Sequence, residues 1–356
     1  MSDPAQGQAS NGGFEPGELR AVLRALGVEK PDRIRPLTKG DPRNAKALIE
    51  VPGRSGVLKR LPRFGDDRAF AARVAFRRRL REIGLPVPAF DVVVRGGVRY
   101  ELVEWVAGSR YASKREQAGA AGAQLALFHS SAASAVEGLK LPSLPRVDDD
   151  VEHAIARLRS GLAPESAHAI ARLERDWHES RDRAQDLGLP LEPLSPVHGD
   201  YHPGNLIYED GSPAVSALLD FDRCGVGSPL TELCSASLFF ALRRRGLDPA
   251  AWSSSPDAEL LESFWTCATA GGATEAGAST AAEAAPWLMI LSVVRELIPA
   301  VATLGSLGTL GGEGAIGYAA GLTQWLAENS RGVSDVLAGR GGGPGIDAGE
   351  NAGAAS

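Results

Sequence analysis

The sequence predicts an α+β protein with two lobes: a small lobe built on an antiparallel β-sheet with one inserted helix, and a larger lobe that is mostly helical. Between residues 33 and 106, short apolar segments with strand-like composition are separated by turn residues. From residue 116 onward, apolar residues recur at helical spacing over long segments. At 356 residues the chain is long enough for two packed lobes.

The small lobe is predicted to open with a helix over residues 18–26, where Leu19, Val22, Leu23 and Leu26 share one face. A second helix is predicted over residues 66–83, where Phe76, Leu80 and Ile83 recur at helical spacing. It is expected to end before Gly84 and Pro86. Five strands are expected, at residues 33–37, 45–51, 56–61, 90–94 and 100–106.

The large lobe is predicted to be helical except for an interruption at residues 195–227. Its helices are expected at residues 116–130, 151–185, 229–245, 257–270, 286–301 and 317–328. The boundary between the lobes is expected near residues 104–108, which gives a small lobe of residues 14–103 and a large lobe of residues 104–330. Residues 1–13 and the Gly- and Ala-rich tail, residues 331–356, contain little that can be buried and are expected to be disordered.

Composition argues against several classes of function. The net charge is −6, with 38 basic and 44 acidic residues, so nothing calls for nucleic acid as a partner. The longest strongly apolar run, residues 287–294, is too short to cross a bilayer, and the N-terminus lacks the features of a secretory signal. Three scattered cysteines form no metal or disulfide pattern. A cytoplasmic protein that needs no membrane is therefore expected; the oligomeric state is left open.

One segment departs from this balanced charge. Residues 54–81 contain far more basic than acidic side chains, most of them within the predicted helix 66–83. A solvated cationic helix face is the favoured interpretation, and a role near phosphate is the alternative.

The chemistry is concentrated in residues 198–205, HGDYHPGN, and in residues 218–222, LLDFD. An Asp that accepts a proton from a hydroxyl, followed by an Asn and a second Asp that hold Mg²⁺ against nucleotide phosphates, is the equipment of phosphoryl transfer. Asp200, Asn205 and Asp220 occur in that order. A His-rich turn followed by a core strand is the plain alternative, but it does not account for so many coinciding positions.

This pattern resembles the aminoglycoside phosphotransferase and choline kinase group, which are small-molecule kinases with a protein-kinase-like fold. The resemblance implies ATP and Mg²⁺ as cofactors, Asp200 as the catalytic base, and Asn205 and Asp220 as metal ligands. It also implies that Lys59, on a predicted strand, contacts the α and β phosphates of the nucleotide. Asp222 is a further candidate for the metal, and neutralisation by Arg223 is the alternative for it.

The same resemblance places nucleotide contacts in two other segments. Gly40 and Asn44 match a loop that lies over the nucleotide, although Asp41 stands where a second Gly is common. Glu104 and Val106 match the hinge, whose backbone would pair with adenine. Trp105 between them is equally compatible with the interface of the lobes.

Three further side chains are expected to support the catalytic loop rather than react, and a fourth, His129, is expected to have another structural role. His198 and His202 lack a third metal ligand and are predicted to brace the loop through hydrogen bonds. Glu232 stands where the family usually has Asp, and either carboxylate can brace that loop. His129 is expected to pack in the core or cap its helix.

One feature of the family is missing. The lysine that contacts phosphate is usually paired with a Glu on the small-lobe helix, but residues 68–81 contain no acid, and Arg73 falls near the expected place. Asp66, Asp67 or Glu82 would have to substitute, or Lys59 is held differently. This absence keeps open a catalytically impaired nucleotide-binding module.

The preferred function is ATP-dependent transfer of the γ-phosphate to a hydroxyl of a small molecule, such as homoserine, an amino sugar or an aminoglycoside antibiotic. Many regulated protein kinases have an Arg at the position of Gly199, and a long activation segment where only residues 221–227 precede Ser228. The acceptor is therefore expected to be small, in a pocket from the helical stretches after residues 151 and 257. A compact Ser/Thr protein kinase of the bacterial stress-response type is the alternative enzyme.

Overall fold

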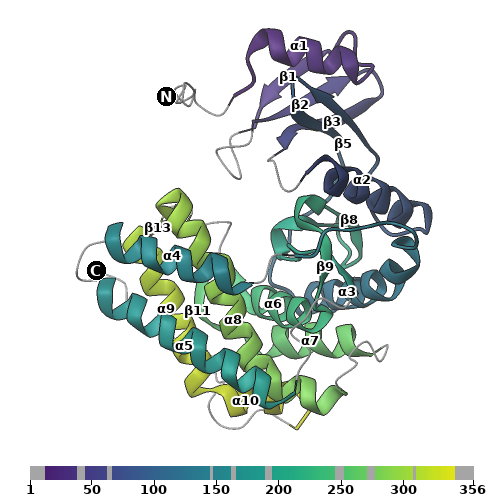
Figure 1. Ribbon diagram of the computed structural model, residues 1–356. Helices are drawn as coiled ribbons and strands as arrows, with labels where there is room; N and C mark the ends of the chain where they lie inside the picture. Colours follow the sequence, from purple (N-terminus) through teal and green to yellow (C-terminus); the bar gives the residue numbers. More distant parts are fainter. Residues whose placement is uncertain are drawn as a thin grey trace, which may run out of the picture.

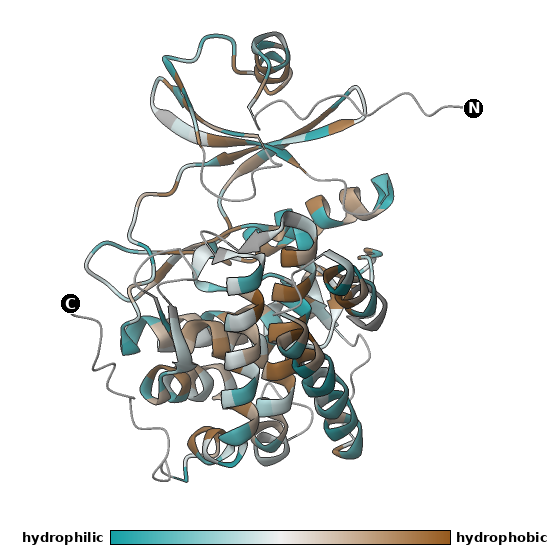
Figure 2. Cartoon of the chain, turned by 90° about the vertical axis from the view of Figure 1, so that its left-hand side faces the viewer, coloured by the Kyte–Doolittle hydropathy of each residue, from teal (hydrophilic) through white to brown (hydrophobic). Residues whose placement is uncertain are grey.

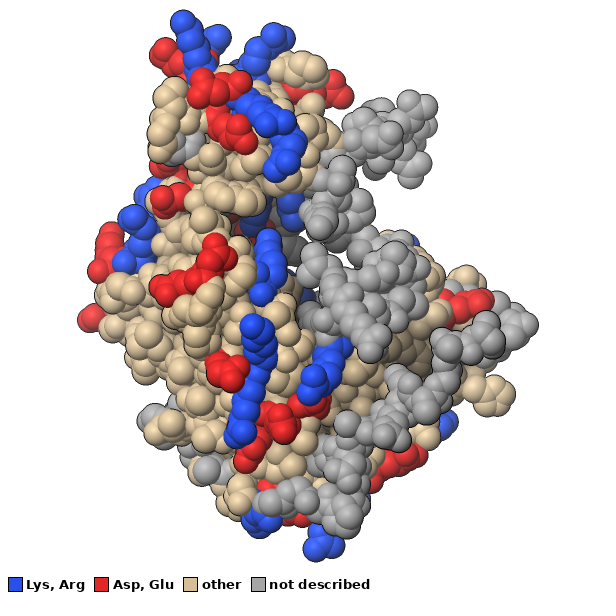
Figure 3. All heavy atoms as spheres, turned by 180° about the vertical axis from the view of Figure 1, so that it is seen from behind, with Lys and Arg blue, Asp and Glu red and all other residues tan. Residues whose placement is uncertain are grey.

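The computed structural model describes residues 13–37, 45–61, 66–144, 147–161, 166–188, 195–244, 252–270, 277–307 and 310–340. They form the two lobes that the sequence predicts, with a small β-sheet lobe above a larger helical lobe (Figure 1). On the face shown in Figure 3, Lys and Arg side chains lie among Asp and Glu side chains on both lobes.

The small lobe is built on one antiparallel sheet with the strand order β1-β2-β3-β5-β4. The prediction of five strands is confirmed, with small shifts at their ends. The strands are β1 (Arg33–Pro36), β2 (Lys46–Val51), β3 (Arg54–Leu61), β4 (Phe90–Arg95) and β5 (Val98–Glu104). Strand β5 ends at Glu104, and from there the chain passes into the large lobe.

Helix α1 (Pro16–Ala25) packs on one face of this sheet. Its buried Val22 and Leu23 join Leu58 of β3 in a separate small-lobe core. At its edge the Arg60 guanidinium pairs with the carboxylate of Glu18 at 2.6 Å. The outer face of the sheet is therefore closed without any contribution from the large lobe.

Helix α2 (Asp67–Glu82) lies where the two lobes meet (Figure 1). It begins at Asp66, whose side chain accepts a hydrogen bond from the Ala69 backbone N–H at 2.8 Å. Phe76 and Leu80 are fully buried in the core of the large lobe, where the Phe76 ring meets Phe128 edge to face. The helix is thus fixed to both lobes.

The prediction of a solvated cationic face on this helix is wrong in part. Arg77 is only 4% exposed, and Arg73 Nε donates a hydrogen bond to the Cys224 carbonyl at 2.8 Å. These arginines are held inside because acceptors from the sheet and from the large lobe face them, which composition alone does not reveal.

The large lobe is a helical assembly with apolar residues concentrated on its central helices (Figure 2). Its helices are α3 (Arg115–Ala135), α4 (Val147–Gly161), α5 (Ala167–Asp186), α6 (Pro229–Ala241), α7 (Ala258–Thr269), α8 (Ala278–Leu304), α9 (Gly312–Glu328) and α10 (Ser330–Leu337). Helix α8 contacts α4, α5, α6, α9 and α10. Among the described residues α8 is the one helix long and apolar enough to cross a membrane, but 72% of its apolar window is buried inside the protein, as in a core helix.

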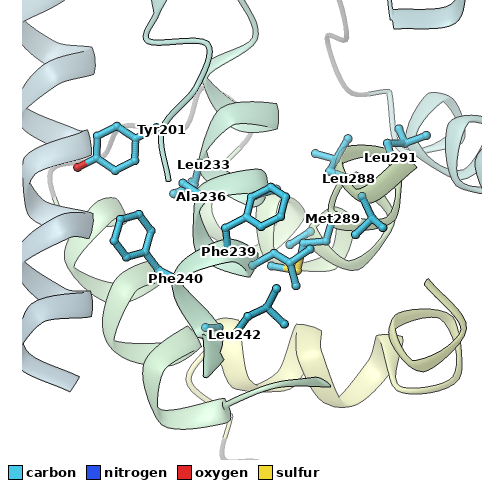
Figure 4. Packing of buried hydrophobic residues seen from close by; sticks show 14 of the residues in the cluster. Tyr201, Leu233, Ala236, Phe239, Phe240, Leu242, Leu288, Met289 and Leu291 are labelled. Atoms are coloured by element: carbon cyan, nitrogen blue, oxygen red, sulfur yellow. The ribbon is translucent and has the colours of Figure 1, made fainter. Parts of the chain in front are cut away.

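Helix α6 connects this core to the candidate site. Phe239 and Phe240 lie between Tyr201 on one side and Leu288 and Met289 of α8 on the other (Figure 4). The Tyr201 hydroxyl donates a hydrogen bond to the Ala121 carbonyl of α3 at 2.7 Å. The loop that carries Asp200 is therefore anchored in the buried core of the lobe.

Three expectations for the large lobe need correction. The predicted helix 151–185 consists of two helices, α4 and α5, because Gly161 and Pro164 interrupt the helical sequence between them. Helix α6 ends at Ala241, and β10 (Leu242–Arg244) then pairs with β11 (Trp252–Pro256). Helix α8 begins at Ala278, eight residues before the predicted start at residue 286, and Ala281, Ala282, Ala284 and Ala285 of this added segment are fully buried.

The expected disorder from residue 331 onward is also wrong for its first part. Ser330–Leu337 forms α10, whose Val333, Val336 and Leu337 are buried against the core. The glycine-rich composition of the rest of the tail concealed this short amphipathic segment.

Candidate active site

Two short ribbons bring the two motifs together. Strand β6 (Ser195–Val197) pairs with β9 (Gly225–Gly227), and β7 (Leu206–Tyr208) pairs with β8 (Val215–Leu218). Residues 198–205, the predicted catalytic loop, connect β6 to β7, and residues 219–224, the predicted metal loop, connect β8 to β9. The Leu219 N–H donates a hydrogen bond to the Asn205 carbonyl at 2.8 Å, which ties one loop to the other.

Asp200 lies at the centre of this arrangement. Asn205 Nδ2 donates hydrogen bonds to the Asp200 backbone carbonyl at 2.8 Å and to its Oδ2 at 2.9 Å. His202 Nε2 lies 3.6 Å from Oδ2 and Arg223 Nη1 lies 3.9 Å from Oδ1. Burial alone would raise the pKa of Asp200, but His202, Arg223 and His198 outweigh it and hold the pKa well below its usual range. The carboxylate is ionised at neutral pH.

The same hydrogen bonds fix the orientation of Asn205. Its amino group is occupied by Asp200, so its carbonyl oxygen Oδ1 points away from the catalytic loop and has no partner among the described residues. An amide oxygen is a ligand that Mg²⁺ accepts.

Asp220 faces Lys59 across the junction of the lobes. Lys59 Nζ lies 3.5 Å from Asp220 Oδ1. Burial acts to neutralise both groups, yet their attraction prevails: the net pKa of Lys59 is raised and that of Asp220 is lowered. Asp220 has φ 62°, a left-handed conformation that costs a residue other than glycine about 1–3 kcal/mol and is typical of functional sites.

Asp222 stands beside Asp220 rather than beside a cation of its own. The proposed neutralisation by Arg223 is not observed, because Arg223 Nη1 pairs with Glu296 Oε2 of α8 at 2.7 Å. Burial and the adjacent Asp220 raise the pKa of Asp222 to about 8. A divalent cation would relieve the electrostatic repulsion between these two neighbouring buried carboxyl groups.

The residues present therefore fit Mg²⁺ shared with nucleotide phosphates. In the part of the chain that the structure describes, no group of three or more His, Cys, Asp or Glu side chains forms a metal site by itself. Mg²⁺ in phosphotransferases needs only one or two carboxylates, because phosphates and water supply the remaining ligands.

The catalytic loop is braced from below by Glu232 of α6. Its two carboxylate oxygens accept hydrogen bonds from the Gly199 N–H at 2.6 Å and the His198 N–H at 3.2 Å, and His129 Nε2 lies 2.7 Å from Oε2. His198 is fully buried; its Nε2 donates to the Leu219 carbonyl and its Nδ1 accepts from the Asp200 N–H. Burial lowers the pKa of His198, which matches this neutral form.

Gly199 is required by the contact between the two loops. It has φ +78°, and a Cβ atom there would lie 2.3 Å from the Arg223 carbonyl oxygen. An arginine like that of regulated protein kinases has no room at this position.

We expect Gly199→Ala to lower the free energy of unfolding by about 1–3 kcal/mol or more, from backbone strain alone, and to cut kcat because the loops must separate. Thermal melts and steady-state kinetics check this. Gly211→Ala is the matched control, since Gly211 has a similar φ of +75° but nothing within 4 Å of its added Cβ. Equal loss of kcat in both variants would contradict the assigned role of the close contact.

Glu104 and Val106, the predicted hinge contacts to adenine, lie at the end of β5 and just beyond it. The Glu104 N–H donates to the Ala89 carbonyl and the Trp105 N–H to the Ser55 carbonyl, whereas the Val106 N–H makes no backbone hydrogen bond among the described residues. Trp105 is 48% exposed and so does not form an interface core there. Gly40 and Asn44 lie outside the described residues.

Two parts of the site were missed at the sequence level. Glu296 lies in α8, and no spacing rule links it to Arg223. Arg77 of α2 pairs with Glu101 of β5, which lies in register with Lys59. The sequence did contain a signal for the pair of Arg77 and Glu101, because Glu101 is an acid within a predicted strand.

A two-lobed fold in which a lysine of the sheet pairs with Asp220, and Asp220 follows a loop tied to the one that carries Asp200 and Asn205, is the arrangement of a kinase-like phosphotransferase. The chain belongs to the phosphotransferase enzyme family, whose model matches residues 33–266. A search of the curated proteins finds no match to this sequence.

Solved structures share the fold at low sequence identity. Choline kinase from Cryptosporidium parvum Iowa II superposes with a TM-score of 0.60 at 12% identity, over 90% of this chain and 97% of that one. A microcompartment-associated aminopropanol kinase gives 0.54 at 17% identity, over 89% and 98%. A thermostable mutant of an aminoglycoside phosphotransferase, in a ternary complex with AMP-PNP and hygromycin B, gives 0.54 at 15% identity, over 87% and 97%.

Proposed function

We propose that this phosphotransferase moves the γ-phosphate of ATP to a hydroxyl group of a small molecule, with Asp200 as the base. The observation that carries the proposal is the convergence of Lys59, Asp200, Asn205 and Asp220 through direct contacts at the junction of the lobes. Their roles in the reaction follow from their charges and orientation.

The acceptor oxygen attacks the γ-phosphorus, and the bond from that phosphorus to the oxygen bridging the β-phosphate breaks, so that ADP leaves with the electron pair. The acceptor proton passes to Asp200 Oδ. Because the pKa of Asp200 is held low, it takes the proton late and acts first by orienting the hydroxyl. Lys59 neutralises charge on the α and β phosphates.

Asn205, Asp220 and Asp222 would hold Mg²⁺ at this site. The ion would supply positive charge against the phosphate oxygens as negative charge shifts toward ADP. Asp222 is the residue whose protonated form would have to lose its proton on binding the ion.

The described groups near Asp200 favour a small metabolite over a polycationic antibiotic as the acceptor. Arg223 faces the Asp200 carboxylate and is itself bound to Glu296, which also lies 3.5 Å from Arg295. Cations and an anion thus lie together beside the base, which suits a hydroxyl compound that carries both an amino and an acidic group, such as homoserine. Because the similar solved structures include one bound to hygromycin B and a choline kinase, other amino alcohols are also candidate acceptors to be tested.

A peptide acceptor is less well supported. The metal loop leads through β9 directly to Ser228, which caps α6 by accepting a hydrogen bond from the Thr231 N–H at 3.3 Å. No segment that could dock a peptide intervenes between residues 220 and 229, all of which the structure describes. We propose a cytoplasmic location, where ATP is available.

The test is ADP release with MgATP against homoserine, amino sugars, choline, aminopropanol and aminoglycosides, with a protein substrate mixture alongside. Stimulation by one small molecule, with the phosphorylated product identified by mass spectrometry, establishes the activity and its acceptor. Phosphate transfer to protein alone would overturn the proposal in favour of a protein kinase. Nucleotide binding without turnover on any acceptor would favour an impaired binding module.

A further inference from the structure

The structure shows an unusual charge arrangement around Lys59. Lys59 of β3 and Glu101 of β5 are directly opposed across the antiparallel pair, so their side chains share the face turned toward α2. Glu101 is only 3% exposed, and together with Asp220 its charge favours the protonated form of Lys59. The strand beside Lys59 thus supplies an acid that residues 68–81 of α2 do not.

The helix supplies a cation instead. Arg77 Nη1 donates to Glu101 Oε1, and the two side chains are 5% and 4% exposed. The Arg77 guanidinium lies over the Phe90 ring at 3.8 Å and 5.4 Å from the ring of Phe221, which directly follows Asp220. Arg77 therefore connects α2, β4, β5 and the metal loop at one point.

Lys59 has carboxylates on two sides. Asp220 faces it from the large lobe, and Glu101 is the buried carboxylate that faces it from its own sheet. A buried carboxylate needs a partner to stay charged, and Arg77 is the cation placed to supply that partner. Arg77 Nε has no hydrogen-bond partner in the described part of the chain, and a small hollow beside it is lined by Val74, Glu101 and Asp222.

We propose that Glu101 is the positioning residue for Lys59 and that Arg77 holds Glu101 in place. Where a lysine of this kind is usually paired with an acid on the small-lobe helix, here the acid comes from the neighbouring strand and the helix supplies the cation that holds this acid. The inference rests on the proposed role of Lys59 in binding nucleotide phosphates. Arg77 and Glu101 do not touch the reacting atoms. They set where the ammonium group lies when ATP arrives.

The decisive variant removes both charges at once, because a single substitution leaves a buried charge unpaired. Glu101→Gln/Arg77→Met keeps the volume of the pair, and its fold is checked by a cooperative thermal melt. We expect it to weaken MgATP binding by about tenfold or more, measured by calorimetry, while adenosine, which has no phosphates, binds as to the wild type.

Glu18→Gln/Arg60→Met is the matched control. That pair joins the neighbouring residue of β3 to α1 on the opposite face of the same sheet. It is expected to leave MgATP affinity unchanged. Unchanged MgATP affinity in the Glu101→Gln/Arg77→Met variant would overturn the inference. The pair would then serve only to connect α2 to the sheet.

A cycle with Lys59→Met separates this inference from the function on which it rests. If Glu101 acts through Lys59, its neutralisation has no further effect on MgATP affinity once Lys59 is gone. Full additivity of the two changes would overturn the inference. If Lys59→Met itself leaves MgATP binding intact, the proposed role of Lys59 fails first. If the double variant does not melt cooperatively, Glu101→Asp replaces it in the same cycle. This substitution keeps the charge but shortens the side chain by one methylene.

Discussion

Asp200→Asn is expected to lower kcat by about 10²- to 10⁴-fold, with the KM for MgATP nearly unchanged. The substitution keeps an acceptor oxygen for Asn205 Nδ2, so the loop geometry survives. What it removes is the negative charge that orients the acceptor hydroxyl and takes its proton. The loss therefore falls on the transition state, and steady-state kinetics with the identified acceptor measure it.

Asp210→Asn is the control for this substitution. Asp210 is exposed in the turn between β7 and β8 and contacts no proposed site residue among the described contacts. Its kcat is expected to equal that of the wild type. A turnover in Asp200→Asn within a few-fold of the control would show that another group is the base.

Asp220→Asn is expected to abolish the advantage that Mg²⁺ gives to nucleotide binding. The carboxylate is both the partner of Lys59 at 3.5 Å and a proposed ligand of the ion, so its loss affects both contacts to the phosphates. Asparagine is preferred to alanine because, like aspartate, it adopts the left-handed conformation of residue 220 more readily than most residues, so the substitution adds little backbone strain. Calorimetric titration of ATP with Mg²⁺ and with EDTA measures the effect.

In the wild type, ATP is expected to bind at least about tenfold more tightly with Mg²⁺ than with EDTA, and in Asp220→Asn the two affinities are expected to converge. Glu209→Gln, an exposed acid at the end of β7, is expected to keep the full difference. Retention of the Mg²⁺ advantage in Asp220→Asn would move the ion to another set of ligands.

The two loops of the candidate site, residues 198–205 and 219–224, could be located from the sequence because each motif is local in the chain. Asp200 and Asn205 lie within one turn, and the bond between them is made by the loop itself. The strands of the small lobe were likewise visible as short apolar segments bounded by turn residues. Helix ends were less visible, since α8 begins eight residues before its predicted start and α6 ends four residues before its predicted end.

The partners of these loops could not be predicted because they come from distant elements. Glu101 is an acid in an apolar strand, and only the register of β3 with β5 places it beside Lys59. Arg77 was one arginine among several on a helix that looked solvated, and its burial depends on how α2 lies against the sheet. Glu296 reaches Arg223 only through the packing of α8 in the large lobe.

The connection between the lobes restricts how they can move. Ser109 and Tyr208 exchange two backbone hydrogen bonds, at 2.8 and 2.9 Å, and the close approach of Gly108 to the Tyr208 carbonyl leaves no room for a side chain there. The chain is therefore held to the large lobe five residues after β5 ends, and only residues 105–108 lie between the end of the strand and this contact. Because α2 also packs in the core of the large lobe, we expect opening between the lobes to turn about this short segment and to shift the packing of α2, so the rate at which ADP escapes is expected to depend on residues far from the transferred phosphate.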